Sequence, residues 1–353
     1  MHAPHHSTPQ LPDRLCEDWR FGAPHRHAAA LAQLMQGGTR HGTITLEGAD
    51  DARGKWDVAN VRSIGSAALL ALHHAAEGVG LYLQHDYAEP ITITCETDGV
   101  FMPAVCIAAR AGVHARIIER HICRGEHSAM VCARRIIAEE GAQLSVELQE
   151  EGCGTSRVLN ITDITARGAC VRHLTTHANH EWAREETTAE ALGNAADIQL
   201  FSANRLDGSQ MLDQHTRQLH SDRGCASNLL YKNVLDGRAT AVFAGNIYVA
   251  PGAHDTDAYQ SNRNMLLSEN ATVHSLPGLE ILADRVRCSH GSASAPMDAE
   301  QLFYLLSRGI PRHQAQLLVA DGFLQDVFSR FRASRNAETG AAAEPRGCFD
   351  WRE

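Results

Sequence analysis

The sequence predicts a mainly β fold that ends in a short helical region. From Leu81, short segments of alternating polarity recur over roughly 200 residues, separated by Gly, Asn and Asp, as in strands joined by turns. Only 5% of residues are aromatic, so Ala, Val, Ile and Leu fill the apolar positions. From Asp298 the apolar period becomes helical. Many short strands with irregular turns suit a β-sandwich or a parallel β-helix, and periodicity alone does not decide between them.

Residues 1–80 are predicted to form an N-terminal arm and a helical region of α/β character. The first part, to about residue 22, is rich in Pro, His and polar residues and is expected to be a loose arm. Ala- and Leu-rich stretches at 25–36 and 66–77 predict two helices, each followed by Gly. Between them, 43–46 reads Thr-Ile-Thr-Leu and predicts a strand.

Residues 81–297 are predicted to form the β core. The clearest strand patterns lie at 91–95, 144–148, 170–174 and 241–243. The polar run 181–186 reads Glu-Trp-Ala-Arg-Glu-Glu and is expected to be a loop or short helix at the side of the core. Near the end of the core, Cys288 and His290 lie two positions apart, so both point to the same face if the segment is extended.

Residues 298–333 are predicted to form a C-terminal helical subdomain. Asp298 is a suitable N-cap, with Gln301 three residues later, and Gly309 suits the end of this first helix. Two further helical patterns follow, separated near Gly322. The remaining residues, 334–353, are expected to be a disordered tail.

Composition and the absence of known motifs exclude several classes of function. The 353 residues carry a net charge of −10, which argues against a nucleic-acid binder because such proteins show a basic surface. No apolar run approaches the roughly 20 residues of a transmembrane helix, and the N-terminus lacks the apolar segment of a signal peptide, so we expect no membrane insertion and a cytoplasmic protein. The ten Cys include no C-x-x-C pair. There is also no P-loop, G-x-S-x-G or H-E-x-x-H motif, so we expect no enzymatic activity.

The C-terminal third carries a family resemblance. The run 284–291 reads Asp-Arg-Val-Arg-Cys-Ser-His-Gly. Related stretches lie at 243–249, 260–268, 302–305 and 307–310. Together they resemble the SufB/SufD family, the scaffold subunits of the SUF iron–sulfur cluster assembly machine. The Cys-Ser-His-Gly motif is more similar to SufD than to SufB. The resemblance is dense in the last third, loose in the middle and weak over 1–80. The run 291–296 departs from the family pattern.

This resemblance implies a fold and a function. It implies a right-handed parallel β-helix whose narrow core suits the low aromatic content. It also implies a non-catalytic scaffold subunit that pairs with a SufB-like subunit, binds a SufC-like ABC ATPase and can form a homodimer when isolated. Cys288 and His290 occupy the positions of the proposed cluster-assembly ligands. They would bind a transient iron–sulfur cluster shared with the partner subunit, and this chain alone would hold no permanent cofactor.

The C-terminal helices offer more apolar surface than short helices can bury among themselves. The residues predicted to contact the ATPase are Leu302, Phe303, Leu306, Phe323, Val327 and Phe328. Two alternatives remain open. One is a SufB-like homodimer that holds the cluster itself, and the other is a β-helical polysaccharide-acting enzyme. The second alternative lacks the clustered rows of charged residues that a substrate groove of this kind usually exposes.

Overall fold

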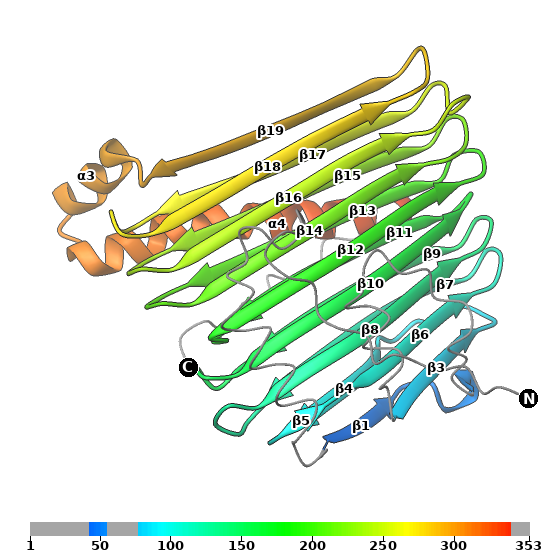
Figure 1. Cartoon of the computed structure of the whole chain (residues 1–353), viewed down its shortest axis with the longest axis horizontal. Coiled ribbons are helices and arrows are strands. Elements are labelled where there is room, and N and C mark those ends of the chain that lie inside the picture. The colour runs from blue at the N-terminus through cyan, green and yellow to red at the C-terminus, as the bar shows by residue number, and fades with distance from the viewer. Residues whose placement is uncertain (1–41, 55–76, 340–353) are drawn as a thin grey trace, which may run out of the picture.

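The computed structural model describes residues 42–54 and 77–339, which form a parallel β-solenoid made of two facing sheets (Figure 1). The nine-stranded sheet contains, in spatial order, β1 (Gly42–Glu47), β4 (Ile91–Thr97), β7 (His114–Cys123), β9 (Gln143–Glu151), β11 (Cys170–Ala178), β13 (Asp197–Leu206), β15 (Ala226–Leu235), β17 (Asp257–Leu266) and β19 (Arg287–Pro296). The ten-stranded sheet contains β18 (Thr272–Ile281), β16 (Thr240–Val249), β14 (Met211–His220), β12 (Trp182–Leu192), β10 (Arg157–Arg167), β8 (Ala129–Ala138), β6 (Pro103–Ala109), β3 (Glu77–Leu83) and β2 (Arg53–Gly54), with β5 (Val100–Phe101) paired to β8.

From β6 onward, consecutive strands alternate between the two sheets, so each sheet pairs every second strand in parallel. Residues stacked in neighbouring coils are separated by 27 positions at His177 and Asn204 and by 31 at Asn233 and Asn264. Among the described strands, antiparallel pairing occurs where β1 meets β4 and where β2 meets β3. The parallel ladders confirm the predicted β-helix and exclude the sandwich that the strand pattern had left open.

The interior of the solenoid is filled by small and aliphatic side chains. Its largest apolar cluster extends from Ala49 to Phe243 and consists mainly of Ala, Val, Ile and Leu. Adjacent parallel strands lie about 4.8 Å apart, so each inward side chain stacks on the equivalent one of the next coil. A large ring would have to fit beneath another large ring in every coil. This repeated stacking accounts for the low aromatic content of the sequence.

Glycine is required at some corners of the solenoid. Gly237, in the turn after β15, has a φ of +61°, a backbone conformation that non-glycine residues adopt rarely. A Cβ built on it would lie 2.9 Å from the carbonyl oxygen of Gly208 in the preceding coil. The corner therefore excludes a side chain for two reasons, backbone strain and the close approach of the neighbouring coil.

The predicted strands at 43–46, 91–95, 144–148, 170–174 and 241–243 are confirmed as parts of β1, β4, β9, β11 and β16. The helices predicted at 25–36 and 66–77 fall on residues outside the described ranges, except for Glu77, which begins β3. The predicted start of the core at residue 81 falls inside β3.

The prediction of a loop or short helix at 181–186 is wrong, because Trp182 begins the eleven-residue strand β12. This strand is polar although it is buried. The interior contains partners for it: Glu185 accepts a hydrogen bond from Gln214 of β14 at 2.6 Å. The charge of the segment had suggested a solvated surface, but here the charge is satisfied inside the solenoid.

Two helices complete the described chain, α3 (Ala299–Ser307) and α4 (Arg312–Thr339). Asp298 caps α3 as predicted, since its side chain accepts a hydrogen bond from the backbone N–H of Glu300 at 2.9 Å. Gly309 follows the C-terminal end of α3, as predicted, and has a φ of +82°. The expected break near Gly322 is absent: α4 is one helix of 28 residues, and it extends beyond the predicted end at 333.

Helix α4 lies along the outer face of the nine-stranded sheet (Figure 1). Its buried face packs on apolar residues of β11, β13 and β15 and forms a second core outside the solenoid. The members of this outer core are Leu174, Phe201, Ala203, Leu230, Val234, Ala320, Leu324, Val327, Phe328 and Phe331. Lys232 of β15 also donates to the Asp326 carboxylate at 2.9 Å and lies over the Phe323 ring. None of the helices in the described ranges has the length and hydropathy needed to cross a membrane.

Candidate functional site

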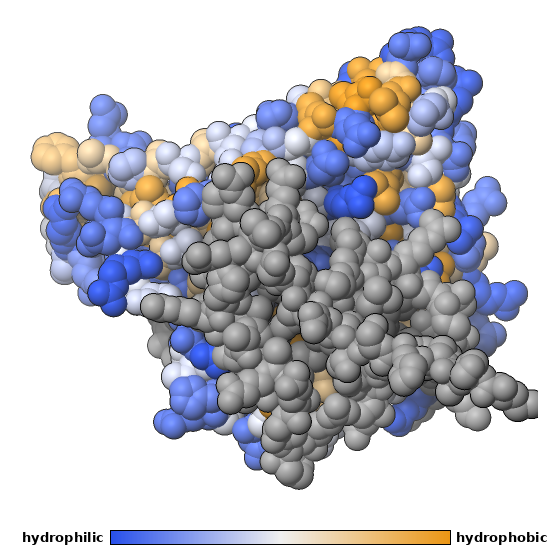
Figure 2. Space-filling view, viewed as in Figure 1, coloured by the Kyte–Doolittle hydropathy of each residue, from blue (hydrophilic) through white to orange (hydrophobic). Residues whose placement is uncertain are grey.

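The solenoid is open at its C-terminal end, where β18 and β19 are the last strands of their sheets. Each has a hydrogen-bonded neighbour on one side, so the backbone groups on its other edge are available for pairing. Large apolar side chains lie exposed here, and Figure 2 shows hydrophobic surface around the end of β18. They are Leu276, Leu279, Ile281 and Leu282, with exposed fractions between 36% and 51%. An open apolar end with two free strand edges is typical of a surface that is covered by a partner.

Cys288 and His290 lie on β19 at this open end. Strand β19 pairs in parallel with β17, which places Cys288 beside Ala258 and His290 beside Gln260. The predicted shared face is confirmed, because both residues continue inward-facing rows of the preceding coils. Cys288 is half-buried and packs against a small apolar cluster that includes Ile247 and Val249, whereas His290 is exposed. The pair therefore lies at the rim of the interior, where the next coil would be if the solenoid continued.

The chemistry of this pair suits a soft metal species. A thiolate is the preferred ligand of iron–sulfur clusters, and an imidazole can complete a mixed ligand set. Burial raises the pKa of the Cys288 thiol, the backbone hydrogen bond from Ala258 opposes this, and the Asp257 carboxylate adds to it. These effects together favour the protonated form of the Cys288 thiol. Two protein donors are too few to hold an iron–sulfur cluster by themselves.

The residues predicted to contact the ATPase fall into two groups. Val327 and Phe328 are buried in the outer core, so they hold α4 on the sheet and are not available to a partner. On α3, Phe303 is 72% exposed, while Leu302 and Leu306 are partly exposed. Phe323 of α4 is also partly exposed and lines a groove of about 1000 Å³ between α3, α4 and the end of β19.

A polar column runs through the interior of the solenoid, and the sequence alone did not reveal it. It occupies one inward position of the nine-stranded sheet in coil after coil. Its members are Cys95, His121, Glu150, His177, Asn204, Asn233 and Asn264. The asparagines hydrogen-bond to one another at 2.8 and 2.9 Å. The sequence signal is a polar residue at one inward position of each strand, but it is visible only once the strands are aligned.

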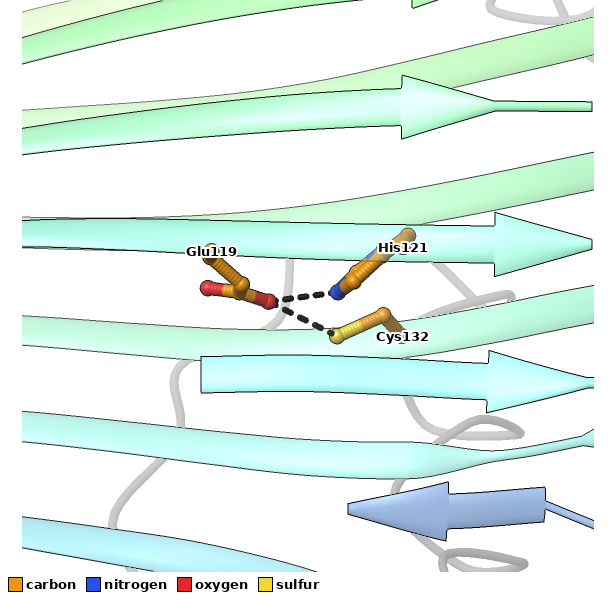
Figure 3. A group of neighbouring side chains, drawn as sticks. All are labelled: Glu119, His121 and Cys132. Carbon is orange, nitrogen blue, oxygen red and sulfur yellow. Dashed lines mark hydrogen bonds and ion pairs between the residues drawn. The ribbon is translucent and has the colours of Figure 1, made fainter. Parts of the chain in front are cut away.

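The N-terminal half of this column lies beside buried charged side chains. Arg134 of β8 donates two hydrogen bonds to the Glu119 carboxylate, at 2.7 and 2.6 Å, and both side chains are fully buried. Figure 3 shows Glu119 pointing toward His121 and Cys132. Burial alone would raise the pKa of Glu119, but Arg134 and then His121 hold the pKa of this carboxyl far below its usual range. His121 lies between Glu119 and Glu150, 2.6 Å from each.

Comparison with known proteins places the chain in a family. Residues 92–323 match the family model described as "SUF system FeS cluster assembly, SufBD core domain". The chain is 33% identical over 188 residues to an iron–sulfur cluster assembly SufBD family protein of Mycobacterium leprae, an alignment that covers 51% of this chain and 48% of the relative. It is 26% identical over 340 residues to a SufBD family protein of Synechocystis, covering 92% of this chain and 70% of the relative.

A third relative is the iron–sulfur cluster assembly protein SufD of Escherichia coli, which is 34% identical over 149 residues, or 42% of this chain and 35% of the relative. The chain spans about half the length of the mycobacterial relatives that it matches. The matched residues cover the solenoid from β4 to β19 and part of the C-terminal helices, and they include Cys288 and His290. From the resemblance at 284–291, the parallel β-helix and the family model that covers most of its coils, we conclude that this chain belongs to the SufBD family of iron–sulfur cluster assembly proteins.

Proposed function

We propose that the chain is a SufD-like, non-catalytic scaffold subunit of a SUF-type complex in the cytoplasm, and that its open end pairs with a SufB-like subunit. The observation that carries this proposal is the uncapped coil at β18 and β19, where Cys288 and His290 lie beside exposed apolar residues. Repeat proteins usually cover their last repeat with a polar cap, and this end has none among the described residues. A partner that supplies further strands would satisfy both free edges and bury the leucines.

The iron–sulfur cluster is the cargo of this interface. Cys288 would supply a thiolate and His290 an imidazole, and the partner subunit would supply the remaining ligands. The family assignment favours such a scaffold over a polysaccharide-acting enzyme. When the partner is absent, the same end is available to a second copy of the chain, which would account for a homodimer of the isolated protein.

The first prediction concerns iron recovery. When the chain is co-purified with SufB-like and SufC-like subunits, His290→Ala should lower the iron and sulfide per complex at least about tenfold, with an unchanged melting temperature, because the imidazole is exposed. Cys288→Ala should lower iron equally and also cost about 1 kcal/mol of stability, since the thiol is half-buried in a small apolar cluster.

The matched control for this experiment is His313→Ala, which removes an exposed imidazole from the start of α4. It should leave both iron content and melting temperature unchanged. Normal iron and sulfide in both the Cys288 and His290 variants would refute the assignment of the ligands. If neither the wild-type chain nor any variant co-purifies with the SufB-like subunit, the proposed pairing itself is refuted.

The second prediction concerns the ATPase. We place the SufC-like subunit on α3 and the adjoining groove, because Phe303 is exposed and no residue of α3 is buried. An aromatic anchor of this kind commonly contributes more than 2 kcal/mol to an interface. Phe303→Ala should therefore weaken binding of the SufC-like subunit by roughly thirtyfold or more, as measured by isothermal titration calorimetry. Arg312→Ala, at the start of α4, is the control, and equal affinity of wild type and Phe303→Ala would reject this placement.

A further inference from the structure

Two members of the polar column and one neighbouring histidine can ligate a metal, far from the open end. Glu150 lies on β9, His177 on β11 and His180 in the turn that follows β11. Glu150 and His177 are direct register partners. Their potential ligand atoms, with that of His180, lie within 4.8 Å of one another, and all three side chains are at most 4% exposed. The group is thus enclosed between the two sheets, several coils away from Cys288 and His290.

Each member of this triad has one atom close to a protein partner, by hydrogen bond or ion pair, and another without a hydrogen bond. Ser156 lies 2.9 Å from Nδ1 of His180, Glu185 lies 2.8 Å from Nε2 of His177, and Asn160 donates to Oε1 of Glu150 at 2.7 Å. The other atoms have no hydrogen-bond partner among the described residues: they are Nε2 of His180, Nδ1 of His177 and Oε2 of Glu150.

This pattern is the one that metal-binding residues show. A ligating histidine usually has its second ring nitrogen held by a carboxylate, hydroxyl or carbonyl, which sets the orientation of the ring. Buried polar atoms in folded proteins are almost always paired, so open ligand atoms on three neighbouring side chains require an explanation. Hydrogen bonds orient Glu150 and His180, an ion pair with Glu185 orients His177, and the open atoms belong to the types that coordinate transition metals.

The neighbouring group Glu119, His121 and Cys132 is a useful contrast. Its potential ligand atoms also lie within 4.8 Å of one another. However, both Glu119 oxygens already accept hydrogen bonds from Arg134, and Oε1 also lies 2.6 Å from His121 (Figure 3). Arg134 neutralises the carboxylate that would attract a cation. Both Glu119 oxygens are therefore occupied, whereas Glu150 has Oε1 2.6 Å from Nδ1 of His121 and leaves Oε2 without a hydrogen bond.

The charge states suit a cation. Burial lowers the pKa of His180 to about 4, so this imidazole is neutral near pH 7 and has a lone pair to offer. Burial would raise the pKa of Glu150, but His121, with His177 and His180, lowers it to about 2, so the side chain is a carboxylate. Burial lowers the pKa of His177 and Glu185 raises it by more, so a bound metal would displace a proton there.

The donor set defines the class of ion. Two imidazole nitrogens and one carboxylate oxygen suit Zn²⁺ or Fe²⁺, whereas Mg²⁺ and Ca²⁺ prefer oxygen ligands alone. Ligand atoms about 2.1 Å from one tetrahedral ion lie roughly 3.4 Å apart. The three side chains must therefore move slightly closer together when the ion binds. Rotation about the last torsions of Glu and His, which are broad, can close them. We propose that Glu150, His177 and His180 bind one divalent transition-metal ion inside the solenoid.

The test is the metal content of the full chain, expressed in medium supplemented with Zn²⁺ or, anaerobically, with Fe²⁺. Because the site is enclosed, the ion should enter during folding. All proteins would carry Ala at His2, His5, His6, His25 and His27, which removes the His-rich N-terminus as a source of adventitious binding. We expect one ion per chain after dialysis against a weak chelator. Glu150→Gln and His177→Gln should each lower this occupancy at least about tenfold.

Two further variants test whether the ion lies at this site and whether residue 180 is one of its ligands. His290→Ala removes the ligand proposed at the open end and should keep the interior ion, which separates this site from the proposed cluster site. His180→Cys replaces an imidazole with a thiolate, so it should retain the ion, and Co²⁺ in this variant should show the sulfur-to-metal absorption that wild type lacks. Absence of a bound ion in wild type, or full occupancy in Glu150→Gln and His177→Gln, would overturn the proposal, as would an unchanged Co²⁺ spectrum in His180→Cys.

Discussion

Replacing Arg134 with Met should lower the free energy of unfolding by about 3–5 kcal/mol. Arg134 is fully buried in the solenoid, where it donates two hydrogen bonds to Glu119 and one to the Thr162 hydroxyl at 2.8 Å. Met has a similar shape, so little volume is lost, but the Glu119 carboxylate keeps its charge without its main partner. An unpaired buried charge is among the most destabilising changes a fold can undergo. Urea unfolding followed by circular dichroism measures the loss.

Two control variants identify the cause. Arg124→Met breaks an ion pair with Glu96 at the surface, and its effect should be much smaller because water solvates both charges. The double variant Arg134→Met with Glu119→Leu removes both charges, so it should recover much of the stability lost in the single variant. If Arg124→Met and Arg134→Met are equally destabilising, the interior charge pair does not have the role given to it here.

Replacing Phe331 with Ala should cost about 3–5 kcal/mol, the usual range for a buried Phe. Phe331 is 2% exposed in the outer core, and its ring meets the edge of Phe201 on β13 with the ring centres 5.6 Å apart. Its loss leaves a cavity under α4 and removes an aromatic contact that couples the helix to the sheet. Thermal and urea unfolding measure the change.

The matched control is Leu318→Ala on the same helix. Leu318 is 49% exposed, so its truncation should change stability by less than about 1 kcal/mol. Native-state hydrogen exchange adds a second readout, because Phe331→Ala should loosen α4 before the solenoid opens. Equal protection of α4 in wild type and in Phe331→Ala would contradict the inference that this face holds the helix on the sheet.

The sequence by itself determined the local features of this protein. Alternation of apolar and polar residues located β4, β9, β11 and β16, since a strand shows its two faces with period 2 wherever its surroundings differ. Asp298 and Gly309 marked the two ends of α3, because capping depends on residues within a few positions. The spacing of Cys288 and His290 was enough to place both on one face, and the run around them identified the family.

Only the tertiary structure decided which residues meet across coils. His177 reaches Glu150 and Asn204 through register partners 27 positions away in either direction, and no local pattern encodes that alignment. Val327 and Phe328 form an apolar helix face whether a sheet or a partner covers it, and the structure shows the sheet. The charged strand β12 looked solvated because burial of a charge depends on its partners, and those partners come from other coils. Local propensity thus specified the strands, while stacking between coils determined what each inward side chain contacts.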